Sequence, residues 1–273
     1  MSQNPLRIIG TPDTLIEAIR NRAESDLGFP ISFEPLDGLK LQQRVVMSPD
    51  SFDVMDHWSI SAELAWAARA IQPIELDRIE EWQSILHEGS EPSFLESICI
   101  GKGAAPGRKL FVQDDLKLGQ DPTKVITMLP TVHNFDSFCY RPHLRYRYFP
   151  DKREESWGWL LEPEVRGRVA LSSHAPIAII EAALAIEARQ LMKFNDIGNL
   201  TISEIDRIID ILIELKRRRH FRGFWDSTEE AVNLMNQKDT DFASIWAQGF
   251  YQLKAKNNSI AFAVPKEGYR GWM

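Results

Sequence analysis

The chain has 273 residues, of which 44% are hydrophobic and 26% are charged, and its formal net charge at pH 7 is −7. This composition is that of a globular protein with room for two lobes or one large domain. The acidic balance excludes nucleic acid as the main partner, because phosphate binding needs a basic face. No apolar run is long enough to span a bilayer.

Strands and helices alternate from the N-terminus. Short apolar runs predict three strands, at 6–11, 31–36 and 52–56. Helical spacing predicts a helix after each strand, and the first of these begins at Pro12 with Leu15, Ile16 and Ile19 on its apolar face. A βαβαβ order of this kind indicates a parallel sheet with helices on both faces.

The middle of the chain is less regular. Residues 92–121 carry four glycines and several charges, and we expect loops there around a single strand at 110–113. An apolar run at 125–129 predicts another strand, which ends at Pro130. Residues 131–140 mix polar and aromatic side chains, so we interpret them as a segment that crosses between two lobes and not as a core strand.

The second half repeats the α/β pattern. Strands are predicted at 168–171, 241–246 and 259–264. An alanine-rich stretch predicts a helix at 177–191, and capping boxes at Thr201 and Ser227 begin two more helices. The basic run 216–220 closes a helical pattern, and we expect it to be a solvated helix end.

Catalytic and metal-binding signatures are absent from the sequence. It contains no nucleophile elbow, no zinc-protease motif, no P-loop and no dinucleotide fingerprint. The two cysteines, Cys99 and Cys139, lie in apolar contexts without metal-ligand spacing. We expect two buried thiols, a disulfide between them stays open, and we expect neither a cofactor nor a metal.

Polar and aromatic residues follow the predicted strands. In open α/β sheets, ligands bind beyond the carboxyl ends of the strands, where helix N-termini also point their free N–H groups. The sequence therefore predicts a small-ligand site made by the residues at these strand ends: Thr11, Asp13, Asp56, His57, Trp58, Ser172, Ser173, His174 and Trp246.

Four stretches, in order, resemble the periplasmic solute-binding proteins of ABC importers, and in particular their spermidine/putrescine-binding branch. Phe52–Met55 resembles the family's "Y-D-V-V" strand, and Met128–Tyr140 resembles its first interlobe crossing. Glu155–Leu171 resembles its "W-x-x-L…P…G-x-V-A-L" stretch, and Val264–Trp272 its "P-K-E-G…W" return crossing. The resemblance extends over nearly the whole chain.

The resemblance implies a type II periplasmic-binding-protein-like fold, with two α/β lobes joined by crossing strands and a cleft that closes on a ligand. Lobe I would comprise 1–133 and 261–273, and lobe II would comprise 134–260. It also implies a binding protein and not an enzyme, a periplasmic location, and an ABC permease of the inner membrane as partner. The N-terminus shows no secretion signal, which by itself suits a cytoplasmic or a mature exported protein.

In polyamine binders of this family, aromatic faces hold the methylene chain and carboxylates hold the ammonium groups, as cation–π and charge-assisted hydrogen bonding favour. The resemblance assigns Trp246 and Trp272 to the aromatic positions. Asp136, in the predicted crossing segment, completes the predicted ligand set.

Two departures from the family pattern keep other ligands open. The family places an acidic residue after its "V-A-L" strand, whereas this chain has Ser172–His174, a helix start that suits an anion. An organic anion or an amino-acid-like ligand is therefore the alternative to an amine. The chain also ends at Met273, before the family's last elements, so we expect an incomplete lobe I that self-associates or is less stable.

Two other classes of function are compatible with the sequence. An enzyme on the same two-lobed scaffold would need a catalytic pair, and His174 beside Ser172 or Ser173 is the candidate. A ligand sensor that signals instead of transporting would keep the same cleft.

Overall fold

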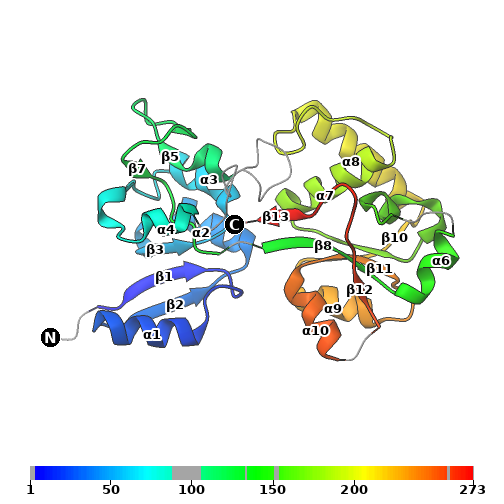
Figure 1. The fold of residues 1–273 in the computed structure, drawn as a ribbon, viewed down its shortest axis with the longest axis horizontal. Helices are drawn as coiled ribbons and strands as arrows, with labels where there is room; N and C mark the ends of the chain where they lie inside the picture. Colours follow the sequence, from blue (N-terminus) through cyan, green and yellow to red (C-terminus); the bar gives the residue numbers. More distant parts are fainter. Residues whose placement is uncertain (1–3, 88–105, 133, 151–153, 257–258, 273) are drawn as a thin grey trace. The chain divides into compact units, whose positions relative to one another are not determined.

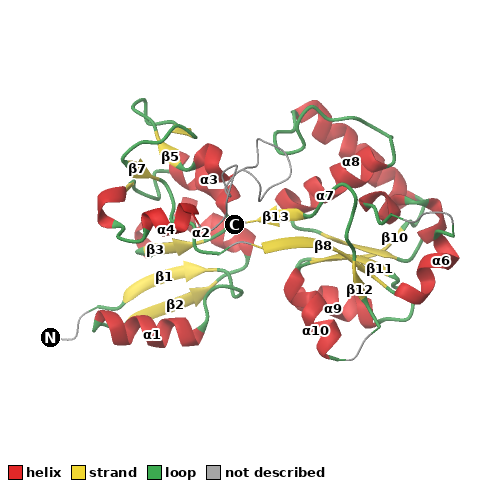
Figure 2. Ribbon diagram, in the orientation of Figure 1, coloured by secondary structure: helices red, strands yellow, loops and turns green. Residues whose placement is uncertain are grey.

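A computed structural model describes residues 4–87, 106–132, 134–150, 154–256 and 259–272. The described chain forms two compact units. Unit 1 holds the described residues up to 131, and unit 2 holds those from 132 onward. Figure 1 follows the chain through each unit, and Figure 2 shows that both are mixed α/β structures.

The main sheet of unit 1 is parallel, with strand order β2-β1-β3. Its strands are β1 (Leu6–Gly10), β2 (Ile31–Pro35) and β3 (Val54–Asp56). The helices of this unit are α1 (Glu17–Leu27), α2 (Gly38–Met47), α3 (Ala62–Ala67) and α4 (Trp82–His87). Its core joins the sheet to α2 and α3 through Ile9, Leu41, Val45, Phe52 and Ala65. The predicted βαβαβ order is confirmed.

The predicted start of the first helix is wrong. Thr14 donates its backbone N–H to the carbonyl oxygen of Thr11 at 3.2 Å, which makes a turn where Pro12 was expected to begin a helix. Helix α1 begins only at Glu17, and Ile16 and Ile19 are 49% and 55% exposed. The apolar spacing was real, but this face does not pack on the core.

Unit 1 also contains a small antiparallel sheet with strand order β4-β7-β5-β6. Its strands are β4 (Ile74–Glu75), β5 (Phe111–Val112), β6 (Leu118–Gly119) and β7 (Val125–Ile126). The sequence predicted strands at 110–113 and 125–129, where β5 and β7 lie in apolar runs, and missed β4 and β6, which lie among charged and polar residues. The predicted loop residues 92–105 lie outside the described residues.

Unit 2 is built on a sheet with strand order β10-β9-β11-β8-β12, in which β13 also pairs with β8. Its strands are β8 (Asn134–Tyr140), β9 (Val169–Ser172), β10 (Phe221–Trp225), β11 (Phe242–Ile245), β12 (Ala261–Phe262) and β13 (Arg270–Trp272). Strands β9, β10 and β11 are parallel, and β8 runs against β11, β12 and β13. The helices are α6 (Arg145–Tyr148), α7 (Ala175–Ala188), α8 (Ile202–Arg217), α9 (Thr228–Asn236) and α10 (Ala247–Ala255).

Strand β8 corrects the interpretation of 131–140 as a crossing segment only. The chain passes from unit 1 to unit 2 near Thr131, but Asn134–Tyr140 is a core strand paired on both sides. Its polar residues Asp136 and Ser137 are buried and have partners within the unit: the hydroxyl of Ser137, for example, donates to the carbonyl oxygen of Ala263 at 2.9 Å. Polarity along the sequence did not mean exposure here.

Strands β12 and β13 both pair with β8, so the described residues from 261 to 272 belong to unit 2. From the sequence, 261–273 were expected to belong to the first lobe. The division into lobes at 1–133 with 261–273 and 134–260 stays a prediction.

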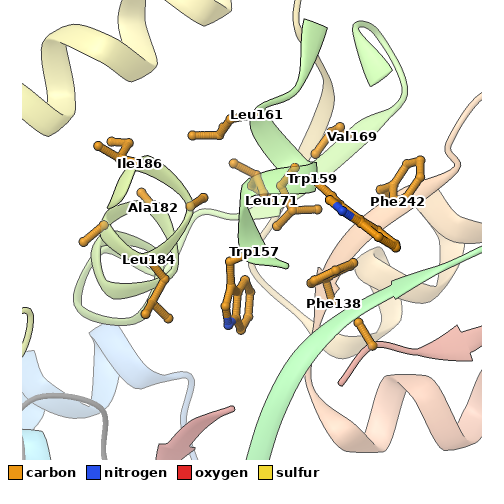
Figure 3. Close-up of a cluster of buried hydrophobic side chains, with 14 of the residues drawn as sticks. Phe138, Trp157, Trp159, Leu161, Val169, Leu171, Ala182, Leu184, Ile186 and Phe242 are labelled. Carbon is orange, nitrogen blue, oxygen red and sulfur yellow. The ribbon is translucent and has the colours of Figure 1, made fainter. Parts of the chain in front are cut away.

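The tryptophan-rich stretch forms the centre of the unit 2 core. Trp157–Leu161 is a buried 3-10 helix, and Figure 3 shows Trp157 and Trp159 among side chains of α7, β8, β9 and β11. The Trp157 indole Nε1 donates to the carbonyl oxygen of Gly268 at 2.9 Å, and Ser156 Oγ donates to Glu267 at 2.6 Å. These two hydrogen bonds join the 3-10 helix to the segment before β13, which lies 111 residues further along the chain.

Helix α8 begins at the predicted capping box, in which Thr201 and Glu204 exchange hydrogen bonds. The basic run after it is a solvated helix end as far as Arg219. His220, however, is 2% exposed, and its Nε2 lies 2.8 Å from the carbonyl oxygen of Leu160. Burial lowers the pKa of His220.

Cys139 is a free, fully buried thiol, and burial raises its pKa to about 12. Cys99 lies outside the described residues, so its predicted burial stays a prediction.

Candidate functional site

In unit 1 the carboxyl ends of β1 and β3 are neighbours. Strand β1 lies between β2 and β3. The connection after β1 leads to β2 on one side, and the connection after β2 leads to β3 on the other side of β1. Open α/β sheets bind ligands outside the carboxyl ends of the strands at such a switch point. All the residues predicted to bind ligand in this unit lie there: Thr11, Asp13, Asp56, His57 and Trp58.

The close approach of these two strand ends depends on Gly10. A Cβ atom at Gly10 would lie 2.8 Å from the carbonyl oxygen of Asp56, closer than real Cβ atoms come. Thr11 follows and is 4% exposed, and its carbonyl oxygen holds the turn at Thr14. Asp13 is exposed as a residue, although partial desolvation of its carboxyl raises its pKa.

His57 and Trp58 form an aromatic pair at the end of β3. His57 Nδ1 accepts the backbone N–H of Trp58 at 2.6 Å, so Nε2, which lies 3.3 Å from the carbonyl oxygen of Gly38, carries the proton in the neutral ring. The two rings meet edge to face at 4.8 Å. These contacts fix the positions of the two rings just after the end of β3.

Unit 2 has a second switch point, between β9 and β11. Strand β9 lies between β10 and β11, and all three are parallel. The predicted residues Ser172, Ser173 and His174 end β9 and lead into α7, and Trp246 follows β11 directly. Both predicted sets thus lie at the carboxyl ends of parallel strands, and their role in binding ligand stays a prediction.

The hydrogen-bond donors at the end of β9 are largely used inside unit 2. Ser173 donates to the carbonyl oxygen of Trp225 through its backbone N–H at 2.8 Å and its hydroxyl at 3.0 Å. The His174 N–H donates to Ser172 Oγ at 3.2 Å, and His174 Nε2 lies 2.7 Å from the carbonyl oxygen of Asp226. A proline at the second position of α7 removes another N–H. This helix start offers an anion fewer donors than the sequence suggested.

Aromatic rings dominate the same strand ends. Trp246 is 9% exposed and meets Trp225 edge to face, with 5.0 Å between ring centroids. The centroids of the His174 and Trp246 rings lie 5.4 Å apart, and the angle between the ring planes is 46°. The sequence analysis missed Trp225 because the run that forms β10 follows the basic helix end and was not predicted as a strand.

Asp136, predicted to bind ligand, is 1% exposed and has partners within unit 2. Its Oδ2 pairs with Arg270 Nη2 at 2.6 Å, and its Oδ1 accepts the backbone N–H of Ala247 at 3.0 Å. Arg270 Nε binds Glu181 on α7 at 2.9 Å. We call Asp136, Glu181 and Arg270 the buried triad. Through Asp136 the triad holds the N–H of Ala247, the first residue of α10, which directly follows Trp246.

Trp272 belongs to β13, where its backbone pairs with Asn134. Its side chain lies outside the described part of the structure, so the prediction that it contacts ligand stays a prediction.

Glu181→Gln is expected to change the pH dependence of stability. Desolvation raises the pKa of Glu181 although Arg270 opposes it, so the folded chain keeps a proton that the unfolded chain releases above about pH 4.3. Stability from this group is present at low pH and is lost as pH rises toward the folded pKa.

Glutamine has no proton to lose, so the variant should gain stability relative to the wild type as pH rises. Urea unfolding at about pH 4 and about pH 7 measures this difference. Glu204→Gln, at an exposed helix cap with a lowered pKa, should show the opposite trend. A Glu181 difference that is constant with pH contradicts the prediction.

Along the described ranges, no three His, Cys, Asp or Glu side chains are placed to hold a metal ion. None of the helices that the structure describes is both long and apolar enough to cross a membrane.

No protein-family model and no curated protein sequence matches the chain. Solved structures do. The spermidine/putrescine ABC transporter substrate-binding protein PotD from Streptococcus pneumoniae matches with a TM-score of 0.64 and 13% identity, over 99% of this chain and 71% of that one. The fold is that of a two-lobed periplasmic binding protein.

Two further neighbours carry different ligands on this fold. The periplasmic binding protein AfuA from Actinobacillus pleuropneumoniae, with fructose-6-phosphate bound, matches at TM-score 0.54 and 15% identity, over 99% of this chain and 73% of that one. MotA from A. tumefaciens B6, in complex with glucopine, matches at 0.59 and 13%, over 95% of this chain and 69% of that one. These neighbours are binding proteins that hold different small molecules, so the fold alone does not identify a ligand.

Proposed function

We propose that this chain is the substrate-binding component of an ABC-type importer and that it captures a small polyamine-like amine. The observation that carries the proposal is that, in each unit, the polar and aromatic groups predicted at strand ends lie at a switch point between parallel strands. In this proposal the protein works in the periplasm and delivers its ligand to a permease of the inner membrane. It has no catalytic role.

The chemistry of the strand ends supports an amine. Unit 1 offers the carboxylates of Asp13 and Asp56 beside Trp58, and unit 2 offers Trp246. Carboxylates bind ammonium groups through charge-assisted hydrogen bonds, and indole faces attract cations and cover methylene groups. The donors of the Ser172–His174 stretch, which would favour an anion, are mostly engaged with backbone carbonyl groups. An organic anion or an amino-acid-like ligand is therefore the second candidate.

The described contacts also bear on the hypothesis that the chain is an enzyme with a serine–histidine pair. The hydroxyl of Ser173 and the Nε2 of His174 are directed to the backbone carbonyl oxygens of Trp225 and Asp226. A serine nucleophile needs its hydroxyl hydrogen-bonded to the base that takes its proton. This arrangement favours binding over catalysis.

The test is a thermal-shift titration of the purified chain with putrescine, spermidine, glutamate and citrate. A ligand at about a hundred times its dissociation constant adds about 2.7 kcal/mol of stability. We expect putrescine or spermidine to stabilise the wild type. Asp56→Asn should weaken this binding by about 10-fold or more, since a hydrogen bond to a charged group contributes about 1.5–3 kcal/mol.

Asp210→Asn is the matched control, because it removes one exposed carboxylate on α8 in unit 2. It should leave the affinity unchanged. Trp246→Ala should weaken binding and Trp246→Phe should restore most of it, with each variant's melting temperature measured without ligand as the check on folding. Stabilisation by citrate alone would replace the amine with the anion, and no stabilisation by any of the four would overturn the proposal.

A further inference from the structure

Unit 2 contains a surface cavity of about 410 Å³ at the opposite edge of its sheet from Ser172 and Trp246. The cavity is lined by residues that precede strands: Arg168 comes directly before β9, and Asp241 comes directly before β11. Arg141 follows β8, which runs the other way. The amino ends of the parallel strands therefore form its floor, and the ligand site proposed above lies at their carboxyl ends.

The cavity is strongly basic in an acidic protein. Its lining includes four cationic side chains, Arg141, Arg147, Arg168 and Lys238, and a single carboxylate, Asp241. With His143 neutral, this leaves three positive charges around one cavity, whereas the whole chain carries −7. Such a concentration of one sign inside a concave surface raises the local concentration of ions of the other sign.

The carboxylate of Asp241 is buried beneath the cavity and serves to hold the basic groups. Asp241 is 3% exposed and accepts the Tyr148 hydroxyl at 2.7 Å. It also lies 3.7 Å from Arg141 Nε and 3.9 Å from Arg168 Nε. Desolvation and this contact raise the pKa of Tyr148, which keeps the phenol a hydrogen-bond donor.

Arg141 is fixed further by the end of α9. Its Nη2 donates to the carbonyl oxygens of Met235 and Gln237 at 2.7 and 3.0 Å, and its side chain is only 21% exposed. Arg147 and Lys238 are exposed. The cavity thus combines a fixed guanidinium, whose Nε and Nη2 already donate to backbone carbonyl oxygens, with two solvent-accessible cations.

We propose that this cavity is an oxyanion-binding site, taking phosphate or the phosphate or carboxylate groups of a larger anion. Arginine guanidinium groups match these planar or tetrahedral oxygen sets, and charge-assisted hydrogen bonds to them are strong. The volume lies at the lower end of the range for small-molecule sites, which suits an ion of this size. The site is independent of the proposed transport function.

The experiment is isothermal titration calorimetry of the full chain with inorganic phosphate, at constant ionic strength set with sodium chloride. We expect saturable binding with one site. The double variant Arg147→Ala/Lys238→Ala should weaken it by about 10-fold or more, because it removes two charged contacts. Neither residue lies in the core, so a circular dichroism spectrum equal to that of the wild type is expected.

The matched control is Arg207→Ala/Arg217→Ala on α8, which removes the same charge from exposed positions outside the cavity. It should bind phosphate as the wild type does. No saturable binding, or equal loss in both double variants, would overturn the proposal and leave only diffuse charge attraction. Binding of a polyglutamate peptide without binding of phosphate would also overturn it, and would assign the surface to an acidic protein segment.

Discussion

Arg270→Met is expected to lower the free energy of unfolding by about 3–5 kcal/mol, because it leaves two buried carboxyl groups without their cation. Asp136, Glu181 and Arg270 are each less than 5% exposed. Arg270 satisfies both acids at once, with distances of 2.6 and 2.9 Å. Urea unfolding followed by circular dichroism measures the loss.

Arg218→Met is the matched control, since it removes an arginine–glutamate pair of the same geometry at the surface. Arg218 Nε lies 2.8 Å from Glu214, and the two side chains are 68% and 49% exposed. Such a pair contributes about 0.3–0.5 kcal/mol. The triple variant Asp136→Asn/Glu181→Gln/Arg270→Met should recover part of the loss, because no unpaired charge remains buried. Equal costs for Arg270→Met and Arg218→Met would mean that the buried triad has no such energetic role.

The buried triad links strand, helix and site. Glu181 lies on α7, Arg270 on β13 and Asp136 on β8, and Asp136 also accepts the first N–H of α10. The residue before that N–H is Trp246. Loss of the triad should therefore loosen the indole that the proposed function uses, without any direct contact between Arg270 and ligand.

The parts of the fold that could be predicted are those in which one local signal suffices. Strands β1, β2, β9 and β11 are segments of four or five residues with two or more apolar or aromatic side chains, and a capping box at Thr201 marks the start of α8. The errors arise where tertiary contacts decide. The face of Ile16 and Ile19 has helical spacing, but these side chains are about half exposed and lie outside the unit 1 core, and β8 mixes polar and aromatic residues in sequence but is paired on both sides.

For the candidate site, too, the positions of residues along the strands could be predicted, whereas their contacts could not. That Asp56 and Ser172 would stand at strand ends follows from chain order alone, since parallel strands present their carboxyl ends at one edge. That Ser173 would give its donors to Trp225, or that Asp136 would meet Arg270 at a separation of 134 residues, depends on register between distant strands. No periodicity or motif carries that information. Whether these residues bind a ligand stays a prediction.

Trp159→Ala is expected to lower the free energy of unfolding of unit 2 by about 3–5 kcal/mol, as for other large aromatic side chains removed from cores. Trp159 is 1% exposed, stacks on Phe149 at 4.5 Å and meets Tyr140 edge to face at 5.7 Å. Figure 3 shows it within the cluster that α7 covers. Chemical unfolding monitored by tryptophan fluorescence and circular dichroism would measure the loss.

The comparison with phenylalanine separates packing from hydrogen bonding. Among the described residues, Trp159 Nε1 has no hydrogen-bond partner, whereas Trp157 Nε1 donates to Gly268. Trp157→Phe and Trp159→Phe remove the same volume from equally buried positions. Trp157→Phe should cost about 0.5–1.5 kcal/mol more, the net contribution of one hydrogen bond, and Trp159→Phe should be partly offset because a desolvated N–H is removed. Equal costs would mean that the buried N–H of Trp159 carries no desolvation penalty, and that packing alone decides stability at the centre of this core.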